Sequence, residues 1–134
     1  MADITVPQVD GVITSDEVQA TVDGIAEWQL PNGMVPWYPG GHADPWNHVE
    51  AAMALALGGR ISEAERAYDW LVGLQRPDGA WHQYYVEDGI EDDKFDANVV
   101  AYVAAGVWHH WLLTEDRGFA ETLYRAKSWK GPRR

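Results

Sequence analysis

The chain of 134 residues contains no cysteine. This absence excludes disulfide scaffolds, cysteine nucleophiles, iron–sulfur clusters and zinc sites built on thiolates. Long apolar runs are also missing, since the longest, Ala51–Leu57 and Val99–Val107, are too short to span a bilayer. The first residues, MADITVPQVDG, lack the basic flank and apolar run of a signal peptide, so we expect a cytoplasmic protein without a membrane span.

Basic residues are few and unevenly placed. Ten Lys and Arg stand against 21 Asp and Glu, the formal net charge is −11, and five of the ten basic residues fall within residues 125–134. Nucleic acids and anionic membranes are bound mainly through Lys and Arg, so the acidic body excludes both as partners. The expected partner is a neutral small molecule, or an anion bridged by a divalent cation.

Aromatic residues, by contrast, are plentiful. Eight Trp, six Tyr and two Phe supply enough apolar surface for one folded domain. Apolar residues recur at helical spacing in four segments, and no segment alternates for long enough to indicate a strand. The sequence therefore predicts an all-α fold. The expected helices span residues 14–29, 45–57, 62–75 and 96–113, and the last is apolar on nearly all sides, which predicts that it is buried.

Three of these helices begin at recognisable capping signals. Thr14 with Glu17, and Ser62 with Glu65, have the spacing of a capping box. Asp44 before Pro45 places an N-cap side chain ahead of a residue that needs no N–H in the first helical turn. These signals set the expected starts of the first three helices.

The sequence also repeats internally. Gln29–Gly33 (QLPNG) matches Gln75–Gly79 (QRPDG) at a spacing of 46 residues. Each copy follows an amphipathic helix and leads through a polar or aromatic loop into a more apolar helix. The repeating unit is thus a helical hairpin of about 45–50 residues.

The second unit carries a longer pattern, Arg66-Ala67-x-x-Trp70-Leu71-x-x-x-Gln75-x-x-x-Gly79-x-Trp81. This pattern resembles the QW motif of triterpene cyclases. The surrounding sequence, about residues 14–129, resembles actinobacterial prenyltransferases with squalene-cyclase and prenyltransferase repeats. The resemblance implies an α/α toroid, in which inner and outer helices alternate around a cavity, an isoprenoid-type ligand, and transferase or cyclase chemistry. It implies structural roles for Arg66, Trp70, Gln75, Asp78, Gly79 and Trp81.

A third copy starts and stops early. Arg125-Ala126-x-x-Trp129 repeats the beginning of the motif, and Gly131-Pro132 then blocks the helix. We therefore expect a lead-in at residues 1–13, an incomplete toroid domain of two hairpins and the start of a third at residues 14–124, and a basic tail at residues 125–134. Such a domain would leave an apolar flank open, to be covered by a second copy or by the remaining part of a toroid.

Residues 91–96 (EDDKFD) contain DDxxD, the pattern with which class I isoprenoid enzymes hold Mg²⁺ and a substrate diphosphate. The resemblance therefore implies catalytic and metal-binding roles for Asp92, Asp93 and Asp96, with Mg²⁺ as the cofactor. The alternative is that Asp93 or Asp96 caps the next helix while the other acids complement its dipole. The DxDD string of class II cyclases is missing.

The loop before the second helix is the richest in binding groups. Flat aromatic rings beside short polar side chains suit a neutral hydroxylated ligand or a polyisoprenoid. His42, Asp44 and His48 also have a metal-like spacing, but Asp44 is already needed as a cap. The predicted substrate-binding residues are Trp37, Tyr38, His42, Trp46, Asn47 and His48.

Two other functions stay open. Six-hairpin glycosidases share the ring of helical hairpins and favour Trp-lined acidic clefts. Hydrolysis there requires a pair of carboxylates, for which Glu87, Asp88, Asp92 and Asp93 are available. The other alternative is a binding module without catalytic activity.

Overall fold

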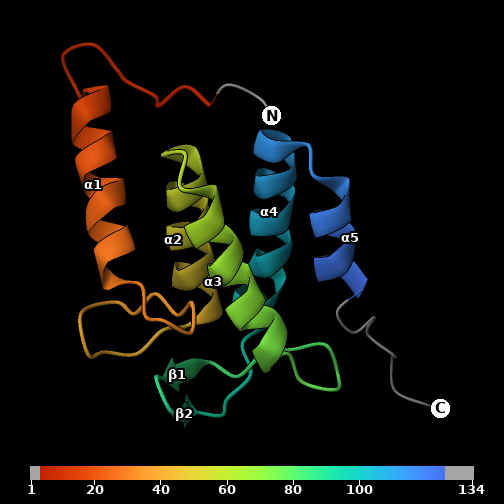
Figure 1. Cartoon of the computed structure of the whole chain (residues 1–134). Helices are drawn as coiled ribbons and strands as arrows, with labels where there is room; N and C mark the ends of the chain where they lie inside the picture. The colour runs from red at the N-terminus through yellow and green to blue at the C-terminus, as the bar shows by residue number, and fades with distance from the viewer. Residues whose placement is uncertain (1–3, 126–134) are drawn as a thin grey trace.

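A computed structural model describes residues 4–125 of the protein (Figure 1). Over these residues the fold consists of helices and one short antiparallel hairpin, which confirms the predicted all-α class. The elements are α1 (Ser15–Trp28), α2 (Pro45–Leu57), α3 (Ile61–Leu74), β1 (Tyr84–Val86), β2 (Gly89–Asp92), α4 (Ala97–Thr114) and α5 (Arg117–Arg125).

The helices form successive antiparallel pairs (Figure 1). Helix α2 packs against both α3 and α4, while α1 lies against α2 and α5 lies against α4. The hairpin of β1 and β2 lies at the end of the bundle where α2 and α4 begin. Loops that are distant in the sequence therefore meet at this end of the molecule.

The core is built around α2. One cluster joins Val49 and Ala52 of α2 to Tyr68 and Leu71 of α3 and Val103 of α4. Gly106 allows α4 to pack closely against α2, because a Cβ at this position would lie 2.3 Å from a methyl carbon of Val49. A second cluster, at the other end of α2, consists of Val22, Val35, Leu55, Ala56 and Ala64.

The sequence repeat is also a repeat of structure. The Gln29 amide donates to the Gly33 carbonyl at 3.1 Å, and the Gln75 amide donates to the Gly79 carbonyl at 3.0 Å. Both glycines have positive φ, 96° and 85°, which favours glycine over any other residue. The turns are further closed by two Asx contacts, from Met34 N–H to Asn32 at 3.0 Å and from Ala80 N–H to Asp78 at 3.1 Å.

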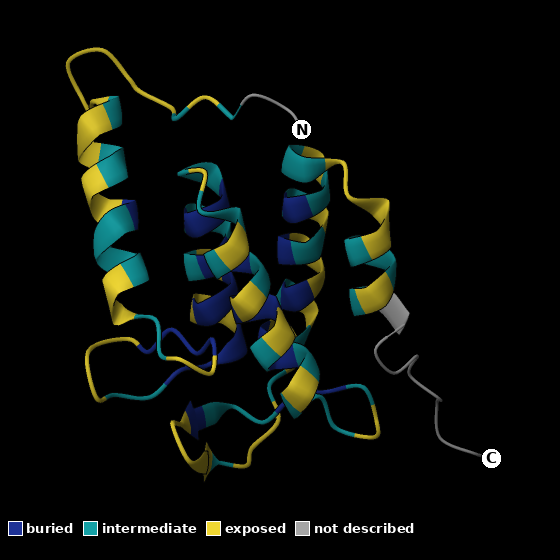
Figure 2. Cartoon of the chain, in the orientation of Figure 1, coloured by how far each residue is buried: buried dark blue, intermediate teal, exposed yellow. Residues whose placement is uncertain are grey.

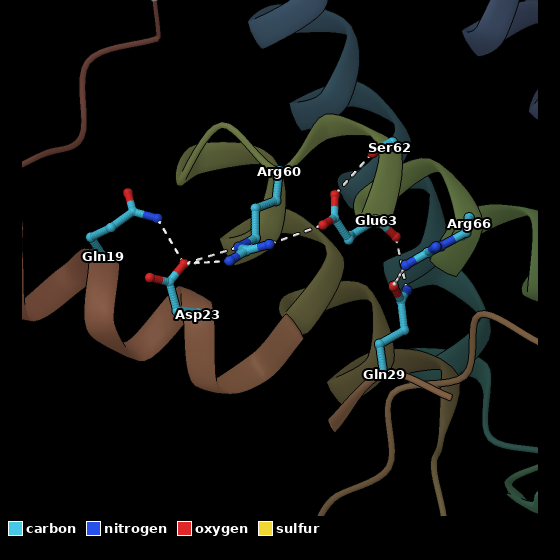
Figure 3. Close-up of polar contacts among 7 residues, drawn as sticks. All are labelled: Gln19, Asp23, Gln29, Arg60, Ser62, Glu63 and Arg66. Carbon is cyan, nitrogen blue, oxygen red and sulfur yellow. Dashed lines mark hydrogen bonds and ion pairs between the residues drawn. The ribbon is translucent and has the colours of Figure 1, made fainter. Parts of the chain in front are cut away.

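Polar side chains join α1 to α3 (Figure 3). The Arg60 guanidinium donates to Asp23 through Nε at 3.0 Å and Nη2 at 2.8 Å, and to Glu63 at 3.0 Å. Gln29 donates to the Glu63 carbonyl at 2.9 Å and accepts from Arg66 at 2.7 Å. These contacts orient the first helical pair against the second.

Two local expectations need correction. The strands β1 and β2 were not expected, because segments of three and four residues are too short to show an alternating pattern. Helix α3 begins at Ile61 after Arg60, without a side-chain cap. Ser62 lies inside the first turn and donates to Glu63, so it does not form the predicted box with Glu65.

Helix α4 is less buried than its composition predicts (Figure 2). Val99, Val103, Gly106 and His110 are buried, but Trp108 is 60% exposed and Leu112 is 55% exposed. No helix within the described residues is long and apolar enough to cross a membrane. The incomplete third repeat, with Trp129, Gly131 and Pro132, lies outside the residues that the structure describes.

Candidate functional site

The loop that precedes α2 is fixed to the hairpin. Ala43 and Tyr85 exchange two backbone hydrogen bonds, of 2.9 Å and 2.8 Å. Neighbouring side chains on a strand point to opposite faces, so Tyr85 enters the core while Tyr84 faces the loop. This contact brings residues 37–47 next to residues 83–91.

A cleft of about 320 Å³ lies between the loop, the hairpin and the first turns of α2 and α4. Trp37 is 46% exposed and Trp46 is 37% exposed, which leaves part of each indole open to solvent. The lining residues are Trp37, Asp44, Trp46, Asn47, Gln83, Tyr84 and Val99.

Asp44 organises one wall of the cleft, although it is only 3% exposed. One carboxylate oxygen accepts the Asn47 backbone N–H at 3.0 Å and so caps α2. The other accepts the Trp37 indole N–H and the Asn47 side-chain amide, each at 2.7 Å. A helix cap therefore also fixes two groups that line the cleft.

His42 connects the loop to the hairpin. Its Nδ1 lies 2.7 Å from the Glu91 carboxylate. Its ring stacks on Tyr84, with a centroid distance of 4.6 Å, and meets the edge of Trp37 at 4.8 Å. His42 thus supports two lining residues without being among the cleft residues itself.

Trp46 is held by a second carboxylate. Its ring stacks on Tyr102 of α4 with a centroid distance of 4.6 Å and an interplanar angle of 13°. The indole N–H donates to Glu50 at 3.0 Å, and the Tyr102 hydroxyl donates to the same oxygen at 3.2 Å. Burial, followed by the nearby Glu50 charge, raises the pKa of Tyr102 and keeps its hydroxyl protonated.

The remaining predicted ligand-binding residues lie elsewhere. Tyr38 is 55% exposed, and its ring is 6.3 Å from His42, outside the cleft lining. His48 faces the core, is 1% exposed and cannot reach a ligand in the cleft. Its Nδ1 accepts the Val35 N–H at 3.1 Å, so Nε2 carries the proton and donates to the Ala67 carbonyl at 2.8 Å.

The three aspartates that the sequence predicts as metal ligands differ in their surroundings. Asp92 binds the backbone N–H and the ammonium group of Lys94, each at 3.0 Å, and these contacts lower the pKa of Asp92. Asp96 caps α4 by accepting N–H groups at 2.8 Å and 3.2 Å, and Asp93 is exposed. Within residues 4–125, no three His, Asp or Glu side chains are grouped so that they could hold a metal ion.

The motif residues of the second repeat make contacts within the fold and do not line the cleft. Trp81 is 7% exposed and donates its indole N–H to the Leu71 carbonyl at 2.7 Å. Trp70 packs against His48 and Tyr85, with centroid distances of 4.5 Å and 5.5 Å. Gln75, Asp78 and Gly79 form the repeated turn, and Arg66 reaches Gln29 of the first turn.

Several groups around the cleft were not identified from the sequence: Glu50, Gln83, Tyr84, Glu91 and Tyr102. The spacing of four residues between Trp46 and Glu50 is a local signal, since such pairs share a helix face. No local pattern joins Tyr84 or Tyr102 to the loop. Glu87 and Asp88 line a separate groove of about 440 Å³ with Asp69 and Trp70.

Comparison with known proteins finds a curated glycosidase that is similar to this chain. No protein-family profile matches the chain. Over 119 residues, or 89% of its length, the chain is 50% identical to "MMP endo-(1,4)-3-O-methyl-alpha-D-mannosidase" of Mycolicibacterium hassiacum. The chain spans only about a third of that curated relative, 33% of its length.

This similarity corrects the resemblance to prenyltransferases and terpene cyclases. The relative is a glycosidase by name, which favours the carbohydrate-active alternative and not a transferase or cyclase. The pattern from Arg66 to Trp81 was misleading for a physical reason: its residues stabilise a helix end and the turn that follows. Any packed helical hairpin can use such contacts, whatever its ligand.

Proposed function

We propose that this chain supplies a carbohydrate-binding cleft of a glycosidase-like α/α toroid, with (1→4)-linked 3-O-methyl-α-D-mannosides as ligands. The observation that carries the proposal is the cleft with Trp37, Trp46 and Tyr84 on its walls. Sugar rings present C–H faces that pack on aromatic rings, while their hydroxyl groups need nearby hydrogen-bonding partners. Asn47 and Gln83 provide such partners in the same cleft. The mannosidase relative supports this choice of sugar.

We propose binding as the role of this segment, and not hydrolysis by itself. Glycosidases cleave with two carboxyl groups that flank the scissile bond. Among the described residues that line the cleft, Asp44 carries the one carboxylate, and both of its oxygens accept hydrogen bonds from protein groups. Hydrolysis would require a second carboxyl group that faces the ligand.

The first test is a titration with (1→4)-linked 3-O-methyl-α-D-mannose oligosaccharides, followed by tryptophan fluorescence and calorimetry. We expect saturable binding, which the Trp37→Ala change weakens by about tenfold or more, because an open aromatic surface of the cleft is lost. Trp28→Ala is the matched control, since Trp28 is 44% exposed, lies in α1 and does not line the cleft.

Two results would contradict the proposal. One is an absence of saturable binding to the oligosaccharide by the unmodified chain. The other is equal loss of affinity in Trp37→Ala and Trp28→Ala, which would show that the binding surface is not this cleft.

A further inference from the structure

Trp46 and Tyr102 form an aromatic pair that joins two helices at the cleft. Trp46 lies in the first turn of α2 and Tyr102 in α4, and their nearly parallel rings have a centroid distance of 4.6 Å. Tyr102 covers part of the indole, yet Trp46 is still 37% exposed and lines the cleft. The pair therefore presents a supported ring surface to anything that enters the cleft.

Glu50 fixes this pair through one oxygen atom. The Trp46 indole N–H and the Tyr102 hydroxyl both donate to Oε1, at 3.0 Å and 3.2 Å. The N–H of Trp46 is thereby already used. What the indole offers to a ligand is its apolar carbon surface and not a hydrogen-bond donor.

The surroundings of Trp46 divide into apolar and polar parts. Val99, with 9% exposure, adds a second apolar group to the cleft, whereas Asn47 and Gln83 add amides. A methoxy group differs from a hydroxyl group in two ways: it cannot donate a hydrogen bond, and it gains from contact with apolar carbon. The apolar part of the cleft thus suits a methoxy group better than a free hydroxyl.

We infer that the Trp46–Tyr102 pair is the platform on which a 3-O-methyl sugar ring stacks, and that Glu50 is the positioning residue of this platform. The inference rests on the proposed function and adds the aromatic pair that discriminates methylated from unmethylated sugars. One additional methylene-sized group in an apolar site changes affinity by about tenfold or more. The chain should therefore prefer methylated oligosaccharides by about that factor.

The experiment compares Kd values for two α-(1→4)-mannose oligosaccharides of equal length, one 3-O-methylated and one unmethylated. We expect the unmodified chain to prefer the methylated ligand by about tenfold. Trp46→Ala should reduce the preference to about one, and Trp46→Phe should keep part of it because a flat ring remains to stack on Tyr102. Trp28→Ala should leave the preference unchanged.

Glu50 is tested by a rescue. Glu50→Gln keeps an oxygen that accepts both hydrogen bonds and should retain the preference, whereas Glu50→Ala should lose most of it. A merely structural role for Glu50 would lower the melting temperature without changing the ratio of the two Kd values. That result would overturn its assignment as a positioning residue.

Failure of the inference and failure of the proposed function look different. If the unmodified chain does not bind the methylated oligosaccharide, the proposed function is wrong. If it binds that oligosaccharide without the tenfold preference, or if folded Trp46→Ala and Trp46→Phe keep that preference, Trp46 is not the platform. In that case the inference is overturned and the proposed function stands.

Discussion

His48 shows how one side chain can suggest a ligand site and yet belong to the core. In the sequence it follows Trp46 and Asn47, two groups that do line the cleft. Its position one turn into α2 points it inward instead, where it joins Val35 of the loop to Ala67 of α3. Both ring nitrogens are bonded in the neutral form, so the site favours an uncharged imidazole.

The burial of His48 predicts a specific pH dependence of stability. Desolvation lowers its pKa from the ordinary 6.5 to about 4, so the unfolded chain binds the proton more tightly than the folded one. The stabilisation is complete above pH 6.5 and is lost as the pH falls toward 4, at up to about 1.4 kcal/mol per pH unit. Urea unfolding at pH 7.5, 6.0 and 5.0 measures this slope.

His48→Gln isolates this contribution from that of other histidines. Burial also lowers the pKa values of His109 and His110. Both histidines are present in the unmodified chain and in the variant, so they add a pH dependence of the same sign to the stability of each. Glutamine keeps an amide that can donate to the Ala67 carbonyl, but it does not titrate. The variant should be less stable at pH 7.5, and the difference should shrink toward pH 5; parallel curves would show that His48 is not the titrating group.

The start of α4 explains why an acidic run need not bind a metal. Asp96 directs one oxygen to the N–H groups of Asn98 and Val99, which have no partners within the helix. Asp92 pairs with Lys94. Two of the three acids of the DDxxD pattern, Asp92 and Asp96, thus have structural contacts of their own.

Asp96→Ala should therefore reduce the free energy of unfolding by about 1 kcal/mol, the usual contribution of an N-cap. Asp93→Ala is the matched control, since Asp93 is exposed and is not the N-cap of α4. Millimolar Mg²⁺ should leave the melting temperature of the unmodified protein unchanged. A Mg²⁺-dependent rise that disappears in Asp92→Asn with Asp93→Asn would instead establish a cation site.

The sequence predicts those elements whose signals are local. The cap Asp44, followed by Pro45, gives the start of α2 correctly, and the Gly58-Gly59 pair marks its end. The bridge that fixes the hairpin to the loop pairs Tyr85 with Ala43, which lies 42 positions earlier, so no local pattern reveals this contact. Ser62 and Glu65 have the right spacing for a cap, but the N-cap of α3 is Arg60, two residues before Ser62.

In the cleft, too, the sequence predicts the residues that are close together in the chain and misses those that are brought in from elsewhere. Trp37, Trp46 and Asn47 were predicted because they crowd into one short loop and the helix start that follows it. Tyr84 and Tyr102 complete the site only after α2 packs against α4 and the hairpin closes on the loop. The class of ligand was not fixed by residue types, because flat rings and short polar groups suit isoprenoids and sugars alike.

The exposed surface of helix α4 is mostly apolar. Helix α4 contains no Asp, Glu, Lys or Arg over its 18 residues. Its exposed residues recur at spacings of three and four, as in a helix face that packs against another helix. They are Asn98 and the apolar residues Ala97, Ala101, Ala104, Ala105, Trp108 and Leu112.

This surface predicts self-association of the chain at tens of micromolar. A contiguous apolar face on a helix is removed from water when two copies meet, whereas a monomer leaves it exposed. Light scattering after size exclusion should give a mass above 15.0 kDa. Raising the salt concentration should not dissociate the complex, since screening weakens contacts between exposed charges and not apolar ones.

Trp108→Ser with Leu112→Ser should shift the chain toward a monomer, because it removes the two largest exposed apolar side chains of α4. The matched control is Val12→Ser, since Val12 is 78% exposed but lies in the loop before α1, away from α4. The control should associate as the unmodified chain does. A monomeric unmodified chain that binds no apolar dye would mean that the α4 surface is tolerated in water, and the expectation of a covering partner would then be wrong.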